Sequence, residues 1–179
     1  MNLSKTPMKI AGAACGVVSI VLGIAAIALP KWLSYDADLA EIGYGLWSAC
    51  AFIPAQSHVV CTPYTKTADW VKATAALEVV GICVIALAVA LAFLHIFIAK
   101  NNKVAGKLPG PIAIVGGMLM IVGVIVWAVK FKAEPSLELL SLSAGFILAI
   151  VSAIMSFIAG ILFFLGWIAE SRGQTHMVV

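Results

Sequence analysis

Four cysteines and three histidines are the side chains of this sequence that could carry out redox chemistry or bind a metal. Cys50 and Cys61 lie eleven positions apart in a short polar stretch, whereas the other two cysteines lie within long apolar runs. A membrane dithiol oxidoreductase needs a close C-x-x-C pair, which the sequence lacks. None of the histidines has an acidic or cysteine neighbour at the spacing of metal ligands. The histidines are His58, His95 and His176.

Acid–base catalysis is not indicated either. Glu78 and His95 fall on one predicted helix, about 25 Å apart at a rise of 1.5 Å per residue, which is too far for a catalytic pair. The sequence contains neither a glycine-rich phosphate loop nor a nucleophile elbow. We therefore expect no enzymatic activity, no cofactor, no metal site and no nucleic-acid partner.

The elements that must position these residues are membrane spans. Of the 179 residues, 63% are hydrophobic and only 11% are charged, against about 25% charged in a soluble domain. A span needs about 20 apolar residues, and an unpaired peptide group is costly in hydrocarbon, so each apolar run should be a helix. The first run could also be read as a signal peptide, but its removal would leave an odd number of spans. We predict one domain over 1–179, with spans at about 10–30, 73–99, 108–129 and 141–167.

Lysine distribution predicts the orientation of these spans. Lysines at the ends of short loops mark the cytosolic side. The N-terminal segment carries two lysines, and the 100–107 loop carries three with no acid, whereas the 31–72 loop is rich in acids. The 130–139 loop has two lysines that favour the opposite orientation more weakly. We expect the N-terminus, the 100–107 loop and the 170–179 tail to be cytosolic, and the other two loops to be extracellular.

The polar stretch around the two cysteines is predicted to be a β-hairpin. Strands over 43–52 and 57–64, turning near Ala55 and Gln56, would put Cys50 directly opposite Cys61. Facing positions bring their β-carbons to about the 4 Å that a disulfide requires, and the extracellular side is oxidising. Ala-Gln is poor chemistry for a two-residue turn, which leaves a looser turn open. We expect a Cys50–Cys61 disulfide.

The order of residues in the first loop is similar to the W…GLW…C…C signature of the claudins and their relatives, which include the peripheral myelin and epithelial membrane proteins. "ADWVKATAAL" before the second span resembles the peripheral myelin branch, and "IAIVGGMLMIVG" resembles the third claudin span. The resemblance implies a left-handed bundle of four transmembrane helices carrying a small extracellular antiparallel β-sheet. The signature residues are Trp32, Gly45, Leu46, Trp47, Cys50 and Cys61.

The tryptophans are expected to hold this sheet on the helices. Trp32 and Trp47 would place their apolar rings between the sheet and the helix ends, with their N–H groups directed at carbonyls or water. Trp70, just before the second span, is interpreted as an interfacial anchor only.

Three residues inside the apolar runs receive less prominent roles. An acid within a membrane is a functional candidate by default. The second run, however, is longer than the hydrocarbon is thick, so we expect Glu78 to be solvated in the extracellular layer. Cys15 and Cys83 are expected to be packed thiols.

The function that the resemblance implies is structural. Our leading hypothesis is a claudin-like protein of cell–cell junctions in the plasma membrane, self-associating in cis and in trans to form or regulate a paracellular barrier or channel. The alternative is a membrane-organising or channel-auxiliary protein of the myelin and epithelial branch. The short first loop, with Gly45 thirteen positions after Trp32, favours this alternative.

Two further features bear on partners. The terminal Met177, Val178 and Val179 could add a strand to a cytosolic PDZ domain, although a Ser or Thr is more usual in place of Met177. The first loop carries four acids against Lys31 and Lys66, a net charge of −2, which favours at most a modest cation preference in a pore. The acids expected to contribute most are Asp36, Asp38 and Glu41.

Overall fold

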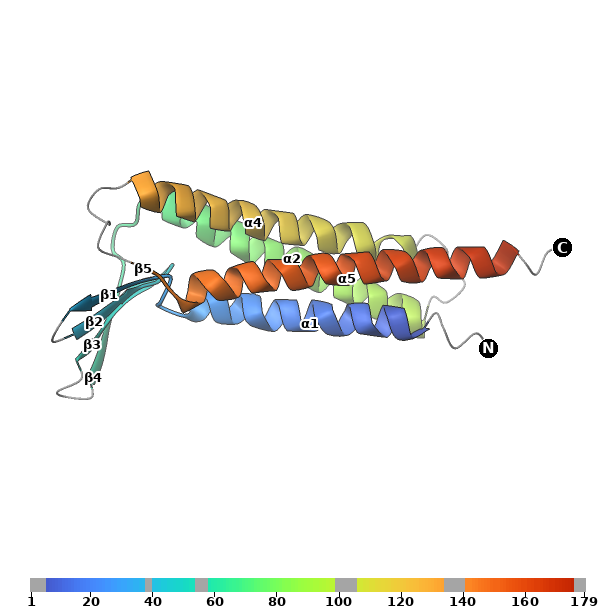
Figure 1. Ribbon diagram of the computed structural model, residues 1–179, viewed down its shortest axis with the longest axis horizontal. Coiled ribbons are helices and arrows are strands. Elements are labelled where there is room, and N and C mark those ends of the chain that lie inside the picture. Colours follow the sequence, from blue (N-terminus) through green and yellow to red (C-terminus); the bar gives the residue numbers. More distant parts are fainter. Residues whose placement is uncertain (1–5, 38–39, 54–57, 99–105, 134–140, 176–179) are drawn as a thin grey trace.

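A computed structural model describes residues 6–37, 40–53, 58–98, 106–133 and 141–175 of the chain. Four long helices run side by side, and a small sheet projects beyond one end of them (Figure 1). All four are long and apolar enough to cross a membrane. The chain forms most of the sheet after the first helix. It returns to the sheet for one short strand just before the last helix. The helices are α1 (Thr6–Ala28), α2 (Asp69–Phe97), α4 (Pro109–Ala133) and α5 (Ala144–Thr175).

The helices approach closely where glycines face each other. A β-carbon on Gly81 of α2 would lie 3.0 Å from the carbonyl oxygen of Gly116 of α4, and a β-carbon on Gly116 would lie 3.0 Å from that of Gly81. Gly110 of α4 and Gly160 of α5 face each other in the same way, at 3.1 and 3.0 Å. Because lipid is as apolar as the side chains, such close packing is what holds membrane helices together.

Buried serines link the same helices. Ser19 of α1 donates to the carbonyl of Ser152 of α5 at 2.8 Å, and Ser152 donates back to the carbonyl of Ser19 at 2.7 Å. Ser156 of α5 donates to the carbonyl of Ala113 of α4 at 2.7 Å. Each hydroxyl thus donates a hydrogen bond to a backbone carbonyl of a neighbouring helix, because a polar group in hydrocarbon needs a partner.

The sheet has five antiparallel strands in the order β4-β3-β2-β1-β5. Four of them come from the segment between α1 and α2, and the fifth directly precedes α5. The residues from 43 to 52 were predicted to form one strand, which is wrong: the chain turns after Tyr44, which ends β2, and resumes at Ser48. The strands are β1 (Leu33–Ala37), β2 (Ala40–Tyr44), β3 (Ser48–Ile53), β4 (His58–Pro63) and β5 (Ser141–Leu142).

Backbone hydrogen bonds connect the sheet and the segment after α1 to the start of α5. The N–H of Trp32 donates to the carbonyl of Tyr44 at 2.8 Å, and its carbonyl accepts from Ser143 at 3.0 Å. Gly145 at the start of α5 donates to the carbonyl of Lys31 at 2.7 Å. The fourth span was expected to begin at 141, but pairing of Ser141 with Ser34 makes that residue a strand and delays the helix to 144.

Candidate functional site

The Cys50–Cys61 disulfide is present, as predicted. The two residues are register partners in the β3–β4 hairpin, with their α-carbons 4.1 Å apart. Cys50 is buried and Cys61 is exposed. The bond therefore joins the edge strand β4 to its neighbour, so the outermost strand is attached covalently as well as by its hydrogen bonds.

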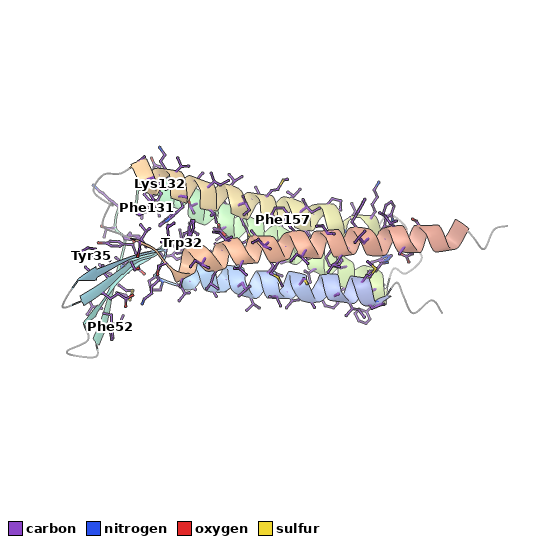
Figure 2. All side chains as sticks on the ribbon, in the orientation of Figure 1. Trp32, Tyr35, Phe52, Phe131, Lys132 and Phe157 are labelled. Atoms are coloured by element: carbon purple, nitrogen blue, oxygen red, sulfur yellow. A yellow bond between two sulfur atoms is a disulfide. The ribbon has the colours of Figure 1, made fainter. Side chains whose placement is uncertain are left out.

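Trp32 forms the joint between the sheet and the helices (Figure 2). Its side chain is fully buried, and its ring lies 5.0 Å from that of Trp127 and 6.3 Å from that of Phe146, measured between centroids. Its indole N–H donates to the carbonyl of Ala26 in the last turn of α1 at 2.7 Å. One side chain thus packs on α4 and α5 while satisfying a carbonyl that the end of α1 leaves free.

Trp47 is attached to the bundle in a different way. Its N–H donates to the carbonyl of Ile27 at 2.8 Å, but its ring is 54% exposed, so the expectation that it fills the space between sheet and helices is wrong. The neighbouring Leu46 is buried instead. Gly45 lies against α1, where a β-carbon would come within 2.6 Å of the α-carbon of Pro30. The Gly-Leu-Trp sequence therefore lets the backbone touch the end of α1, buries the leucine and leaves the tryptophan ring outside.

Trp70 is more than an interfacial anchor, contrary to our expectation. Its ring meets that of Trp127 edge-on at 5.0 Å, so Trp127 lies between Trp32 and Trp70. The three indoles come from the segment between α1 and β1, from α4 and from α2. Aromatic pairs of this kind add stability beyond their buried area. They connect three helices directly beneath the sheet.

The outer part of the sheet exposes apolar side chains. Val59 and Val60 of the edge strand are 61% and 57% exposed, and Phe52 on the neighbouring strand is 37% exposed. Val59 is the register partner of Phe52, so these two share a face, while Val60 points to the other. Figure 2 shows Phe52 on the part of the sheet away from the helices. Clustered exposed apolar residues outside the hydrocarbon mark an interaction surface. We call the exposed apolar side chains of these two outer strands, Phe52 and Val59 on one face and Val60 on the other, the apolar strand surface.

Charges of the first loop are partly paired. Glu41 lies 2.6 Å from the ammonium of Lys31, which reduces its contribution to an acidic field. Asp36 is the register partner of Glu41 across the β1–β2 hairpin, and Asp38 lies outside the described residues. At the start of α2, Asp69 lies 3.6 Å from Lys72.

Tyr64 closes the base of the sheet. Its hydroxyl donates to the carbonyl of Gly45 at 3.2 Å, and its N–H donates to the carbonyl of Trp47. Burial raises the pKa of the Tyr64 hydroxyl above 10, and the nearby Tyr44 raises it further. The hydrogen bond therefore persists to a higher pH than that of an exposed tyrosine.

Glu78 is not solvated, and this expectation is also wrong. Its side chain is fully buried between α2 and α4, with one carboxyl oxygen 3.1 Å from where a β-carbon of Gly123 would lie. Neither of its oxygens has a hydrogen-bond partner among the described residues, and the same is true of the Trp127 indole N–H. The prediction failed because it considered only depth along the helix, whereas burial depends on which side of α2 the residue occupies.

The two cysteines within the spans are less buried than expected. Cys83 is exposed on the outer surface of α2, and Cys15 is half-buried. Neither is bonded. Cys83 therefore does not pack inside the bundle and would face lipid in a membrane.

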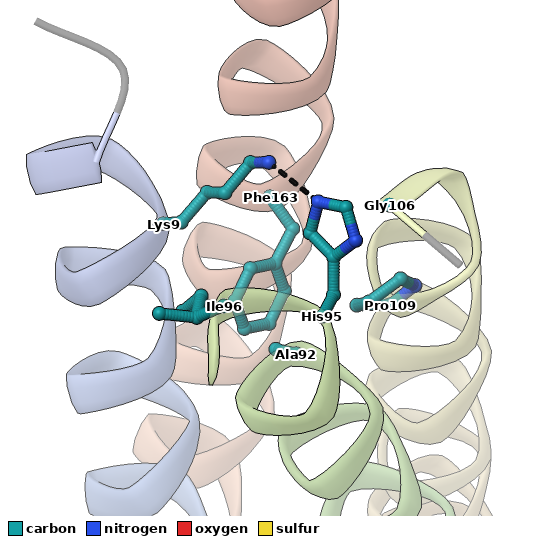
Figure 3. A pocket seen from close by; sticks show the side chains of 7 residues that line it. All are labelled: Lys9, Ala92, His95, Ile96, Gly106, Pro109 and Phe163. Atoms are coloured by element: carbon teal, nitrogen blue, oxygen red, sulfur yellow. Dashed lines mark hydrogen bonds between the residues drawn. The ribbon is translucent and has the colours of Figure 1, made fainter. Parts of the chain in front are cut away.

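A polar cluster missed by the sequence analysis lies at the opposite end of the bundle (Figure 3). Lys9 of α1 approaches His95 of α2 at 2.9 Å and Glu170 of α5 at 2.5 Å. The three residues are far apart in sequence: His95 lies near the end of the predicted second span, whereas Lys9 and Glu170 lie just outside the predicted first and fourth spans. The available signal was their common depth in an up-and-down bundle, which places them in one layer. In the described part of the chain, no group of three or more potential ligands is suited to a metal ion.

Most of the chain matches one known protein family. Residues 8–169 match the model of the PMP-22/EMP/MP20/Claudin family, an extent that includes the whole sheet and nearly all of the four helices. The resemblance noted from Trp32, the Gly-Leu-Trp sequence and the two cysteines is thereby confirmed. With its four apolar helices and the disulfide-linked antiparallel sheet between the first two, the chain belongs to the PMP-22/EMP/MP20/Claudin family.

Proposed function

We propose that this protein is a structural component of cell–cell junctions, in which its sheet contacts other membrane proteins across or along the intercellular space. The observation that carries the proposal is the apolar strand surface. It lies beyond the end of the bundle, on a sheet held by a disulfide, by Trp32 and by backbone hydrogen bonds. A rigid surface loses little conformational entropy on association, which favours binding.

This proposal requires the sheet to be extracellular. The lysine-rich 100–107 loop and the acid-rich first loop favour that orientation under the positive-inside rule. α1 begins and α5 ends at the end of the bundle opposite the sheet, so both termini would be cytosolic (Figure 1). A disulfide in the sheet fits an oxidising compartment. An epitope inserted at Ala55 should be stained on intact cells, and staining only after permeabilisation would reverse the orientation.

Self-association is the mode of contact that we favour. The apolar strand surface would pack against the same surface of a neighbour in one membrane or of a protein in the facing membrane, and a continuous row would restrict the paracellular path. Conduction, where it occurs, would show a modest cation preference from the acids of the first loop. Pairing of Glu41 with Lys31 limits that preference, as does screening over about 8 Å in physiological salt.

On the cytosolic side, we propose that Met177, Val178 and Val179 bind a PDZ domain by adding a strand. These residues lie outside the described part of the chain. A peptide of the last ten residues should bind a PDZ panel, and its amidated form should not, because the free carboxylate is required.

Expression in cells that lack junctions tests the main proposal. We expect freeze-fracture microscopy to reveal continuous intramembrane strands at contacts and the transepithelial resistance to rise. The matched variants are Val59→Asp with Val60→Asp, which charge the apolar strand surface, and Cys83→Ser, which changes a lipid-facing residue. Only the valine variant should abolish the strands at an equal surface level. Scattered particles in wild-type cells would contradict the proposal and support a membrane-organising role.

A further inference from the structure

The polar cluster at the end opposite the sheet joins three helices. Lys9 donates from α1 to the Nε2 atom of His95 on α2 and pairs with Glu170 on α5. The Nε2 atom of His95 also lies 3.5 Å from the same Glu170 oxygen, beyond good hydrogen-bonding distance. We call these three residues the clasp. Lys9 is its central member, because it contacts both of the others.

The clasp fixes the state of the imidazole. A lysine ammonium can only donate hydrogen bonds, so Nε2 of His95 must be the acceptor and cannot carry a proton. Neutral His95 therefore has its proton on Nδ1. That nitrogen is buried and has no partner among the described residues, and only 4% of the side chain is exposed.

The remaining surroundings of His95 are almost entirely apolar. The small pocket beside the ring is lined by residues of all four helical segments, and Figure 3 shows the ring between Lys9 and the start of α4. Gly106 makes room for the ring, since a β-carbon there would lie 2.9 Å from Cε1. Lys107, the nearest other described charge on that segment, places its ammonium 5.5 Å above the Trp167 ring instead. Among the described residues, the charges close to Nε2 are those of Lys9 and Glu170.

We propose that the clasp is a proton-sensitive switch that exchanges partners when His95 is protonated. A proton on Nε2 makes this atom a donor, which eliminates the bond from Lys9 and places two cations 2.9 Å apart. The imidazolium is then attracted by Glu170, which needs to move only slightly to accept its N–H. Glu170 then bonds to His95 in place of Lys9, and Lys9 is displaced toward solvent.

This exchange changes which helices are linked. With neutral His95, Lys9 joins α1 to its neighbours α2 and α5. With protonated His95, the bond runs between α2 and α5, which lie diagonally across the bundle and contact each other little elsewhere. The signal is a proton taken up by the imidazole, so the switch would respond to acidification. The switch does not depend on a role in junctions, because it uses residues at the far end from the sheet.

Nitrogen NMR of the full chain in nanodiscs tests the first step. With His58→Gln and His176→Gln, His95 is the one remaining histidine, and its ¹⁵N signals distinguish the two neutral tautomers from imidazolium. We expect the Nδ1–H tautomer at pH 8 and imidazolium at pH 5. In the Lys9→Met variant the Nδ1–H tautomer should lose its predominance. A wild-type spectrum dominated by the Nε2–H tautomer at pH 8, or an imidazole that stays neutral at pH 5, would overturn the proposal.

A distance measurement tests the exchange itself. Spin labels at Ile10→Cys and Phe97→Cys, both on exposed side chains, report the separation of α1 from the end of α2 after Cys15 and Cys83 are changed to Ser. We expect the distance distribution to shift to longer values between pH 8 and 5. The shift should be lost in Lys9→Met and reduced in Glu170→Gln. An unchanged wild-type distribution, or equal shifts in wild type and Glu170→Gln, would contradict partner exchange even if Lys9→Met failed to fold.

Discussion

The two ends of the bundle are held together by different chemistry. At the sheet end, Trp32 packs on Trp127 and donates to an α1 carbonyl, and a disulfide and backbone hydrogen bonds complete the attachment. At the other end, Lys9, His95 and Glu170 form a charged clasp. Trp32 at the sheet end is fully buried, whereas the side chain of Glu170 at the other end is 32% exposed.

The difference indicates how each end responds to its surroundings. Tryptophan packing and a disulfide do not titrate near neutral pH, so the sheet end should keep one geometry as conditions vary. The clasp, by contrast, is proposed above to exchange partners when its imidazole is protonated. The surface that we propose recognises partners is thus built on constant contacts, and the contacts proposed to be adjustable lie at the far end. The following predictions test this division, from the largest expected effect to the smallest.

Removing the central tryptophan should break the sheet end most severely. Trp32→Ala leaves a cavity beside Trp127 and frees the carbonyl of Ala26, and we expect a loss of about 3–5 kcal/mol in unfolding free energy. The control is Trp47→Ala, because that exposed side chain contributes mainly one hydrogen bond, worth about 1 kcal/mol. Denaturant unfolding in micelles measures both. Equal losses would show that burial of Trp32 does not govern this end.

Removing the disulfide should loosen the edge strand without affecting the helices. Cys50→Ser with Cys61→Ser should cost about 2–4 kcal/mol in the stability of the sheet. Hydrogen exchange should increase in β3 and β4 and stay unchanged in the four helices, because the bilayer holds them independently. Cys83→Ser is the control, since this thiol is free. If hydrogen exchange in β3 and β4 does not increase in the double variant, the disulfide has no local role there. Normal surface delivery together with normal junction localisation would also contradict that role.

Glu78 should be a site where replacement improves stability. Both carboxyl oxygens are buried without a partner, and a buried polar group left unsatisfied costs about 1–3 kcal/mol. Glu78→Met, similar in length and apolar, should therefore raise the thermal unfolding temperature. Thr74→Val is the comparison, because Thr74 donates a long hydrogen bond to the Gly123 carbonyl and should not gain. A lower unfolding temperature in Glu78→Met would indicate that the acid has a partner in the membrane.

The smallest effect is expected at Tyr64. Its pKa is raised in the folded protein, so its contribution is complete below pH 10 and is lost as the pH rises through the folded value. Tyr64→Phe removes the bond to Gly45 and should cost about 0.5–1.5 kcal/mol at neutral pH. The variant should also show a weaker decline of stability above pH 10 than wild type. An identical decline in the two proteins would assign it to other groups.

Much of this architecture was predictable from the sequence. The parts that were not predicted each have a particular reason. The position of Cys50 opposite Cys61 followed from strand pairing alone, because one register fixes all facing residues. The turn at 45–47 was missed, because Tyr44 and Trp47 are aromatic residues of the kind that favour strands. Trp47 was expected to be packed under the sheet and is exposed, whereas Trp70 was expected to be an interfacial anchor only and packs on Trp127, because only the packing distinguishes the two.

The sequence by itself determined the number of helices, the family and the disulfide, because apolar length, the Gly-Leu-Trp signature and cysteine position are properties of the chain. Tertiary structure alone decided which side of each helix faces inward. In a soluble helix the polar face reveals this, but lipid and bundle interior are both apolar, so the pattern of hydrophobic residues does not distinguish them. For that reason the burial of Glu78, the exposure of Cys83 and the meeting of Lys9 with His95 became visible only when the four helices were packed together.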